Sequence, residues 1–268
     1  MKADPLAQLV ETVLASPKYK TVTPDLIQTI GAQELARRRN LKEAVKATKN
    51  KLHQVGGAYF KQSMSYGGWL AQLRHARAGG RTDFLRACAN ILSYHTSTAE
   101  RLPILDQFYA TTLAGLPPIR TVIDVACGLN PLTIPWMGLP EEAVYYAYDI
   151  YQDQIDFLNE FMAIAGITGR AEARDVIQDC PNQPADLALV LKAIPCLEQI
   201  DKTAGARLLD SLNASYLLVS FPVHSLGGRG KGMAVNYEAR FLELVAGRDW
   251  SSIRRFEFAT ELAFLVVR

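Results

Sequence analysis

Short apolar segments alternate with helical segments from residue 119 onward, and this alternation restricts the fold more than any other feature. Five segments have the length and residue types of buried strands: 121–126, 144–150, 171–176, 186–192 and 216–221. Helical stretches separate them, notably at 152–165 and 202–212. Strands that alternate with helices form a doubly wound parallel sheet. Two more strand candidates, at 253–258 and 262–267, can close the sheet with an antiparallel hairpin.

The chain before this region is predicted to be helical. Apolar residues from Leu6 to Leu14 follow helical spacing, and Pro5 and Pro24 each stand at a typical first helical position. A third helix is expected from about Leu41 to Gly56, with further helices at 69–78, 83–94 and 101–113. The sequence therefore predicts an α/β protein with an N-terminal helical domain of residues 1–93 and a sheet domain of residues 94–268.

The helical part carries an excess of positive charge. Residues 1–53 contain ten Lys or Arg and five Asp or Glu, a net charge of +5, whereas the whole chain carries only +2. The remainder is therefore net −3. A basic head suggests a polyanionic partner such as RNA, although a solvated helix surface would have the same charges. One face of the expected third helix carries Lys42, Lys46, Lys49 and His53.

Composition excludes several other classes of protein. The 268 residues are 49% hydrophobic, but no apolar run is long enough to span a bilayer. The four cysteines are scattered and lack metal-ligand spacing: Cys88, Cys127, Cys180 and Cys196. We therefore expect a cytoplasmic protein with reduced thiols, no metal site and no membrane partner.

The ends of the first three strands carry residues that suit a nucleoside. Gly128 follows the first strand, Asp149 ends the second and Asp175 ends the third. Ligands of doubly wound sheets bind at these carboxyl ends. A glycine turn allows close approach, one acid can accept the ribose hydroxyls, and another can accept the adenine amino group. Each acid alone is more often a turn or cap residue, but together they favour a phosphate-free adenosine site, as S-adenosylmethionine requires.

The sequence resembles the aminoglycoside-resistance 16S rRNA methyltransferases that modify guanine N7, the Arm/Rmt group. The similarity covers essentially the whole chain. It is carried by the segments His95–Arg101, Ala126–Leu132, Leu191–Glu198, Ser220–Pro222, Ser225–Met233, Asn236-Tyr237 and Thr260–Leu262. Departures from the family pattern are modest. Ala193-Ile194 stands before Pro195 where family members carry other small or apolar residues. Val223-His224 stands where Thr-Lys or Thr-Arg is common, and the missing cation at position 224 puts one RNA contact in doubt.

The resemblance implies S-adenosylmethionine as cofactor and 16S rRNA in the assembled 30S subunit as partner, and we expect a monomer. It implies that Arg101 contacts the cofactor carboxylate, that Gly128 and Asp149 hold the adenosine, and that Lys192 lies near the methionyl end. The expected cofactor set is His95, Arg101, Ala126, Gly128, Asn130, Asp149, Ile150, Asp175, Val176, Leu191 and Lys192. The expected RNA-binding set is Lys18, Lys20, Lys42, Lys46, Lys49, His53, Arg229, Lys231 and Met233.

The same residues have ordinary structural interpretations. Arg101 could form a surface salt bridge with Glu100 or Asp106, and His95 could be a capping or core residue. Cys127 and Cys196 lie among apolar residues, which favours inert buried thiols over reactive ones.

Guanine N7 has an in-plane lone pair and no proton, so its methylation needs placement and exclusion of water rather than a general base. Three residues are candidates for direct roles in transfer: Lys192, Glu198 and Glu261. The two carboxylates could stabilise the cationic product. The target base has to be flipped out or unpaired to be reached. Two alternatives stay open, an adenine-N1 methyltransferase of the same fold and a non-catalytic RNA-binding protein.

Overall fold

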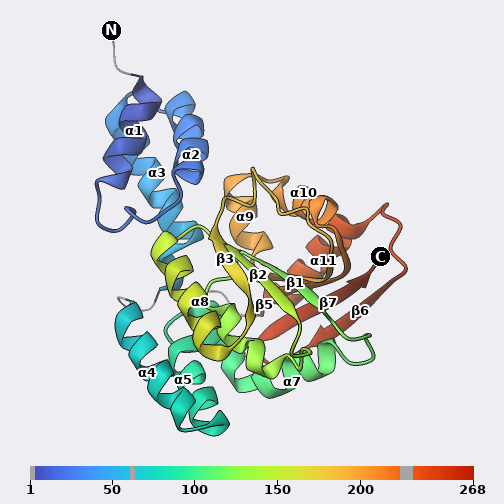
Figure 1. The fold of residues 1–268 in the computed structure, drawn as a ribbon. Coiled ribbons are helices and arrows are strands. Elements are labelled where there is room, and N and C mark those ends of the chain that lie inside the picture. The colour runs from blue at the N-terminus through green and yellow to red at the C-terminus, as the bar shows by residue number, and fades with distance from the viewer. Residues whose placement is uncertain (1–3, 61–63, 224–231) are drawn as a thin grey trace.

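The computed structural model describes residues 4–60, 64–223 and 232–268. Within these residues the structure has one seven-stranded sheet with the order β3-β2-β1-β4-β5-β7-β6 (Figure 1). The parallel strands are β1 (Thr121–Val125), β2 (Val144–Asp149), β3 (Thr168–Ala173), β4 (Ala185–Leu191) and β5 (Ala214–Pro222). The strands β6 (Ser252–Glu257) and β7 (Glu261–Val267) form the closing antiparallel hairpin, and β7 pairs with β5. The predicted sheet and hairpin are confirmed, although β3 begins and ends about three residues earlier than expected.

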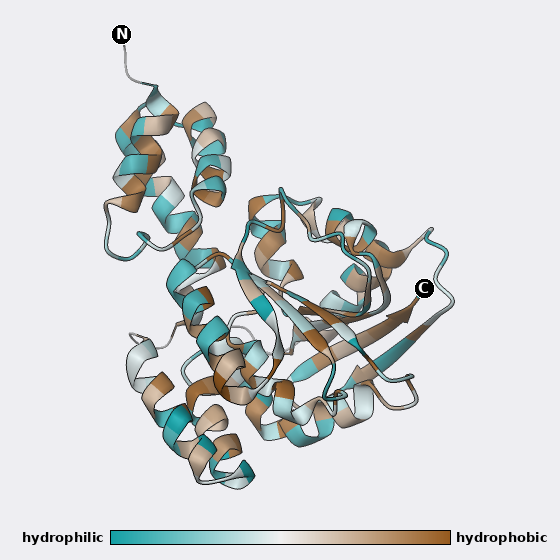
Figure 2. Cartoon of the chain, in the orientation of Figure 1, coloured by the Kyte–Doolittle hydropathy of each residue, from teal (hydrophilic) through white to brown (hydrophobic). Residues whose placement is uncertain are grey.

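Helices cover both faces of the sheet, and its strands are therefore buried on both sides. Alternate residues of β1 belong to different cores: Val122 to one face and Ile123 to the other. The Val122 face is covered by α4 (Tyr66–Ala78), α5 (Arg81–Leu92), α7 (Leu105–Thr112) and α8 (Gln152–Ala165). The Ile123 face is covered by α9 (Ile194–Ile200), α10 (Ala204–Ser211) and α11 (Met233–Val245). Most helices carry hydrophilic and hydrophobic residues side by side, as expected of helices with one buried face (Figure 2).

The first three helices form a separate bundle, which we call the head (residues 4–60). It consists of α1 (Pro5–Leu14), α2 (Pro24–Arg37) and α3 (Leu41–Val55), followed by a short 3-10 helix, η1 (Gly57–Tyr59). Its core contains Leu9, Ile27 and Leu52, among others. In contrast, α4 and α5 pack on the sheet, where Trp69 contacts Phe157 and Phe84 stacks on Phe161. The expected division at residue 93 therefore does not coincide with the division between the hydrophobic cores, which falls near residue 60.

The head joins the rest of the chain, the body, next to the end of β2. The amide of Thr23 donates to the carbonyl of Ile150 at 2.9 Å, and the amide of Gln152 donates to the carbonyl of Thr21 at 2.7 Å. Between these bonds Tyr151, which is 6% exposed, is part of the core of the head. The segment that follows Asp149 is therefore held by both parts of the molecule.

Two further segments differ from the expectation. The helix predicted at 101–113 is three pieces: α6 (Thr96–Arg101), the 3-10 helix η2 (Leu102–Ile104) and α7. Pro103 explains the break, because proline lacks the amide that an α-helix needs there. After β1 the chain forms a 3-10 helix, η3 (Asn130–Trp136), which the sequence analysis did not specify. No helix in the described part of the chain is both long and apolar enough to cross a membrane.

Candidate active site

A cavity lies at the carboxyl ends of the parallel strands, where the sequence places the nucleoside site. Every residue of the expected cofactor set lines it. Five residues of the head, which the sequence analysis did not assign to this site, line it as well: Leu26, Val55, Gly56, Tyr59 and Phe60. The cavity is thus closed on one side by the head, and the aromatic pair Tyr59-Phe60 after Gly56-Gly57 is the sequence signal that could have indicated this wall.

The turn after β1 is held by the acid that ends β2. The amide of Gly128 donates to Asp149 Oδ2 at 2.8 Å, and the amide of Ile150 donates to Asp149 Oδ1 at 2.7 Å. The side chain of Gln154 and the amide of Tyr151 also stabilise this carboxylate. Gly128 has a φ of +54°, and a Cβ there would lie 2.9 Å from the His95 ring. Glycine is therefore required by both backbone conformation and space. The burial of Asp149 raises its pKa above the usual value.

Two residues at the strand ends have strained backbones. Ala126 follows β1 with a φ of 51°, and Lys192 follows β4 with a φ of 57°. They are the non-glycine residues with positive φ among those that the structure describes. Such conformations are uncommon for residues with a Cβ and tend to occur at functional sites. Both residues line the cavity.

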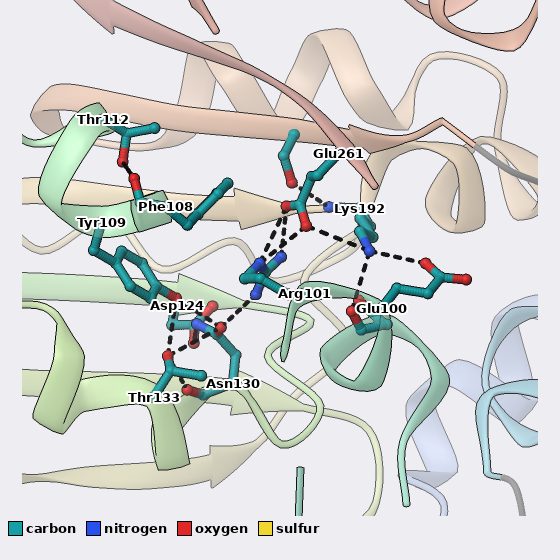
Figure 3. Close-up of polar contacts among 12 residues, drawn as sticks. Glu100, Arg101, Phe108, Tyr109, Thr112, Asp124, Asn130, Thr133, Lys192 and Glu261 are labelled. Atoms are coloured by element: carbon teal, nitrogen blue, oxygen red, sulfur yellow. Dashed lines mark hydrogen bonds and ion pairs between the residues drawn. The ribbon is translucent and has the colours of Figure 1, made fainter. Parts of the chain in front are cut away.

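A buried network of charges lies at one end of the cavity (Figure 3). Arg101 donates from Nη2 to Glu261 Oε1 at 2.7 Å and from Nε to Glu261 Oε2 at 3.0 Å. Its Nη1 donates to Asn130 Oδ1 at 2.7 Å, and its guanidinium lies 4.8 Å from the centroid of the Phe108 ring. Arg101 is therefore a buried residue and not the surface cation that pairing with Asp106 would require.

Lys192 extends this network toward the surface. Its Nζ lies 2.8 Å from Glu100 Oε2 and 3.3 Å from Glu261 Oε2, and it donates to the carbonyl of Ser97 at 3.1 Å. Burial alone would raise the pKa of Glu261, but the neighbouring cations Arg101 and Lys192 lower it below its usual value. Glu261 is thus an anion that holds two cavity-lining cations in place.

The carboxylates that were expected beside the substrate purine have other partners. Glu261 is fully buried and occupied by Arg101 and Lys192. Glu198 forms an ion pair with Arg240 of α11 at 2.6 Å. Neither carboxylate lines the cavity. The expected contact of these carboxylates with the base finds no support in this geometry, because Glu261 has no exposed surface and Glu198 is bound by Arg240 of α11.

Asp124, which the sequence analysis did not select, is a further polar residue of the cavity. Its Oδ2 accepts hydrogen bonds from Tyr145 Oη at 2.7 Å and Asn130 Nδ2 at 2.9 Å. Its Oδ1 is buried and has no hydrogen-bond partner in the described part of the chain. Burial raises the pKa of Asp124 to about 7. An orphaned buried carboxylate oxygen is costly, which suggests that a ligand supplies the partner.

Asp175, which also lines the cavity, has a second carboxylate oxygen left without a partner by the residues that the structure describes. Its Oδ1 accepts a hydrogen bond from the amide of Ile177 at 3.0 Å, whereas its buried Oδ2 has no partner among the described residues. Its burial raises its pKa. Asp175 lies two residues after β3, so the acid is positioned by a turn rather than by the strand itself.

The basic residues expected to bind RNA are divided by the structure. Lys42, Lys46 and Lys20 are exposed. Lys49 donates from Nζ to Ser16 Oγ, and Lys18 Nζ lies 3.0 Å from His53 Nδ1, so three expected contacts are already engaged within the head. Arg229 and Lys231 lie outside the described residues, and their role stays a prediction. Met233 begins α11 and is half-buried.

A family model described as "Ribosomal RNA methyltransferase (FmrO)" matches residues 15–266. The chain belongs to this FmrO family of ribosomal RNA methyltransferases. A relative from Micromonospora rosea is 37% identical over 268 residues, covering 98% of this chain and 97% of its own. Another from Frankia casuarinae is 39% identical over 262 residues, covering 96% and 92%. Both relatives are named 16S rRNA (guanine(1405)-N(7))-methyltransferase.

Solved structures agree with the assignment to the FmrO family. The 16S rRNA methyltransferase RmtF in complex with S-adenosyl-L-homocysteine superposes with a TM-score of 0.86 at 32% identity, covering 100% of both chains. The 16S rRNA methylase RmtB superposes with a TM-score of 0.81 at 30% identity, covering 98% of both chains. The predicted Rossmann-like methyltransferase fold and the resemblance to the Arm/Rmt group are therefore confirmed.

Proposed function

We propose that this FmrO-family protein is an S-adenosylmethionine-dependent methyltransferase that acts on N7 of a guanine in the decoding-site helix of 16S rRNA. The observation that carries the proposal is the set of polar groups that line the cavity, whose chemistry suits the polar parts of the cofactor. The names of the full-length relatives support the choice of rRNA, base and atom.

The cavity offers a partner for each polar part of S-adenosylmethionine. Asp149 would accept the ribose hydroxyls, and the unpartnered Oδ2 of Asp175 would accept the adenine amino group. Arg101 keeps N–H groups that Glu261 and Asn130 do not use, and these would bind the carboxylate. The orphaned Oδ1 of Asp124 would accept the methionyl ammonium. Two of the buried carboxylate oxygens without a partner among the described residues, those of Asp124 and Asp175, would thus be used by the cofactor.

The cofactor supplies a methyl group on a sulfonium cation. The remaining work of this chain is to orient the guanine so that its N7 lone pair points along the methyl–sulfur bond, and to exclude water. No proton leaves N7, so no general base is needed. Tyr59 and Phe60 of the head line the cavity and would shield the bound cofactor from solvent on that side.

The substrate we propose is the assembled 30S subunit, because the head is a separate bundle with exposed lysines suited to a folded RNA surface. Methylation at the decoding site would give resistance to aminoglycosides, and the enzyme would act in the cytoplasm as a monomer. Methyl transfer to intact subunits should therefore exceed transfer to protein-free 16S RNA. Equal rates on both would contradict this substrate.

The two alternatives give different results. An adenine-N1 enzyme of the same fold would transfer the methyl group to an adenine of the subunit, and an RNA-binding protein without activity would not bind the cofactor. Calorimetry with S-adenosylmethionine and mapping of the modified base separate all three. Expression in a sensitive bacterium should in addition permit growth on gentamicin and kanamycin.

A further inference from the structure

The ion pair between Lys192 and Glu100 stands where the cavity meets the surface. Lys192 lines the cavity with a side chain only 3% exposed, whereas the Glu100 side chain is 28% exposed. Glu100 Oε2 contacts Lys192 Nζ at 2.8 Å, and Oε1 has no partner among the described residues. Figure 3 shows the second oxygen directed away from the lysine. Lys192 Nζ, Glu100 Oε2 and Glu100 Oε1 thus follow one another in that order, from the buried lysine to the more exposed carboxylate.

An aromatic ring is fixed beside this pair. The carbonyl of Tyr59 accepts a hydrogen bond from Thr96 Oγ1 at 3.1 Å, in the same short helix α6 that carries Glu100. The hydroxyl of Tyr59 lies 2.9 Å from Cys196 Sγ, in the first turn of α9 directly after Lys192. Tyr59 is therefore tied to both elements that carry the ion pair. One face of its half-buried ring stacks on His95, with the ring centroids 5.8 Å apart, so the opposite face is the one on which a purine can stack.

We propose that Glu100 and Lys192 read the edge of the target guanine and thereby select guanine over adenine. This inference rests on the proposed function. Along its edge guanine presents the N2 amino donor, the N1–H donor and the O6 acceptor, in that order. Glu100 Oε1, Glu100 Oε2 and Lys192 Nζ match these three groups in the same order. Ser97 and Glu100 accept two of the three N–H groups of Lys192, so the one that O6 would take is the third, which Glu261 Oε2 faces at 3.3 Å. Oε2 retains a lone pair beside its bond to Lys192, and a carboxylate accepts two parallel donors well.

The same orientation brings the reacting atom to the correct place. N7 neighbours O6 on the base, so a guanine whose O6 lies at Lys192 directs N7 past the lysine into the cavity. Adenine presents an amino donor where guanine has O6 and an unprotonated N1 where guanine has N1–H. It would therefore oppose donor to donor and acceptor to acceptor at both positions. Sites built to hydrogen-bond one partner reject an analogue with the wrong groups by large factors.

The first test compares Glu100→Ala with Glu160→Ala, a matched control. Glu160 also pairs with a cation, Arg74 at 2.6 Å, but on the surface between α4 and α8. Glu100→Ala should slow methyl transfer to 30S subunits by about 100-fold or more, while S-adenosylmethionine affinity stays within error of the wild type. The Tm should fall only modestly, because Lys192 loses one carboxylate partner and keeps Glu261. Glu160→Ala should behave as the wild type in all three. Unchanged transfer by Glu100→Ala overturns the inference, as does a parallel loss of cofactor affinity, which would indicate a structural role.

The second test changes the target base instead of the protein and compares the rates of methyl transfer. Subunits are reconstituted with 16S RNA carrying guanine, inosine or 2,6-diaminopurine at the target position. The wild type should methylate inosine, which lacks the N2 amino group, about tenfold or more slowly than guanine, and should not use diaminopurine. Glu100→Ala should use guanine and inosine at similar rates. Equal wild-type rates on guanine and inosine overturn the inference alone, whereas no N7 methylation of guanine by the wild type overturns the proposed function itself.

Discussion

Replacing Asp124 by asparagine should change how the stability of the protein depends on pH. Burial raises the pKa of this carboxyl to about 7 in the folded protein, from a usual value of 3.8. The folded state therefore holds a proton that the unfolded chain releases, and wild-type stability falls as the pH rises from about 4 to about 7. At about 1.4 kcal/mol per pKa unit, the loss amounts to about 4 kcal/mol above pH 7.

Asp124→Asn removes this loss because the amide does not ionise. The asparagine oxygen can accept the bonds from Tyr145 and Asn130, and its amino group then takes the place of the orphaned Oδ1. An unsatisfied amino group costs about 1–3 kcal/mol, but this cost is independent of pH. The stability of the variant relative to the wild type should therefore increase by up to about 4 kcal/mol between pH 4.5 and pH 8.

Urea unfolding of both proteins at a series of pH values measures this difference. Asp210→Asn is a control of opposite sign, since the hydrogen bond from Arg248 lowers the pKa of Asp210. That variant should lose stability relative to the wild type at neutral pH and regain it as the pH falls below about 4. At pH 8, Asp124→Asn should also bind S-adenosylmethionine at least tenfold more weakly. Parallel pH profiles for wild type and Asp124→Asn would refute the reasoning about this carboxyl.

Three further predictions follow from the contacts of the cavity and the head. Asp149→Ala should weaken S-adenosylmethionine binding at least tenfold in calorimetry, since two charge-assisted hydrogen bonds to the ribose are lost; unchanged affinity would remove Asp149 from the site. Gly56→Ala should destabilise the protein by about 1–3 kcal/mol and weaken cofactor binding, because the new Cβ would lie 2.6 Å from Tyr151 Oη. In the control Gly67→Ala the new Cβ meets nothing within 4 Å, so thermal unfolding should not change. Reversing the charge of Lys42, Lys46 and Lys49 together should weaken 30S binding in sedimentation assays and leave cofactor affinity intact. Loss of both would mean that these lysines support the fold.

The sheet was predictable because its strands are local, apolar and separated by helices. That the residues of the expected cofactor set line one cavity was predictable for the same reason, since residues at the carboxyl ends of parallel strands lie together. Gly128, Asp149 and Asp175 are therefore brought together by topology alone. Asp124 was missed because an acid inside an apolar strand shows no local sign that one oxygen lacks a partner.

Long-range pairing explains the remaining errors. Glu261 looked available for the substrate, but the pairing of β7 with β5 places it against Arg101, which lies 160 residues earlier in the chain. The wall formed by Tyr59 and Phe60 depends on how the head docks, which helical periodicity does not encode. The assignment of α4 and α5 to the body likewise depends on their packing against α8 rather than on any composition shift.

The central claim is tested most directly by locating the methyl group in the RNA. Purified 30S subunits are incubated with the protein and S-adenosylmethionine, and the 16S RNA is then analysed by nuclease digestion with mass spectrometry and by cleavage at 7-methylguanosine. The account predicts a single new 7-methylguanosine in the decoding-site helix. A methyl group on adenine N1, or RNA that remains unmodified although the protein binds the cofactor, would contradict it.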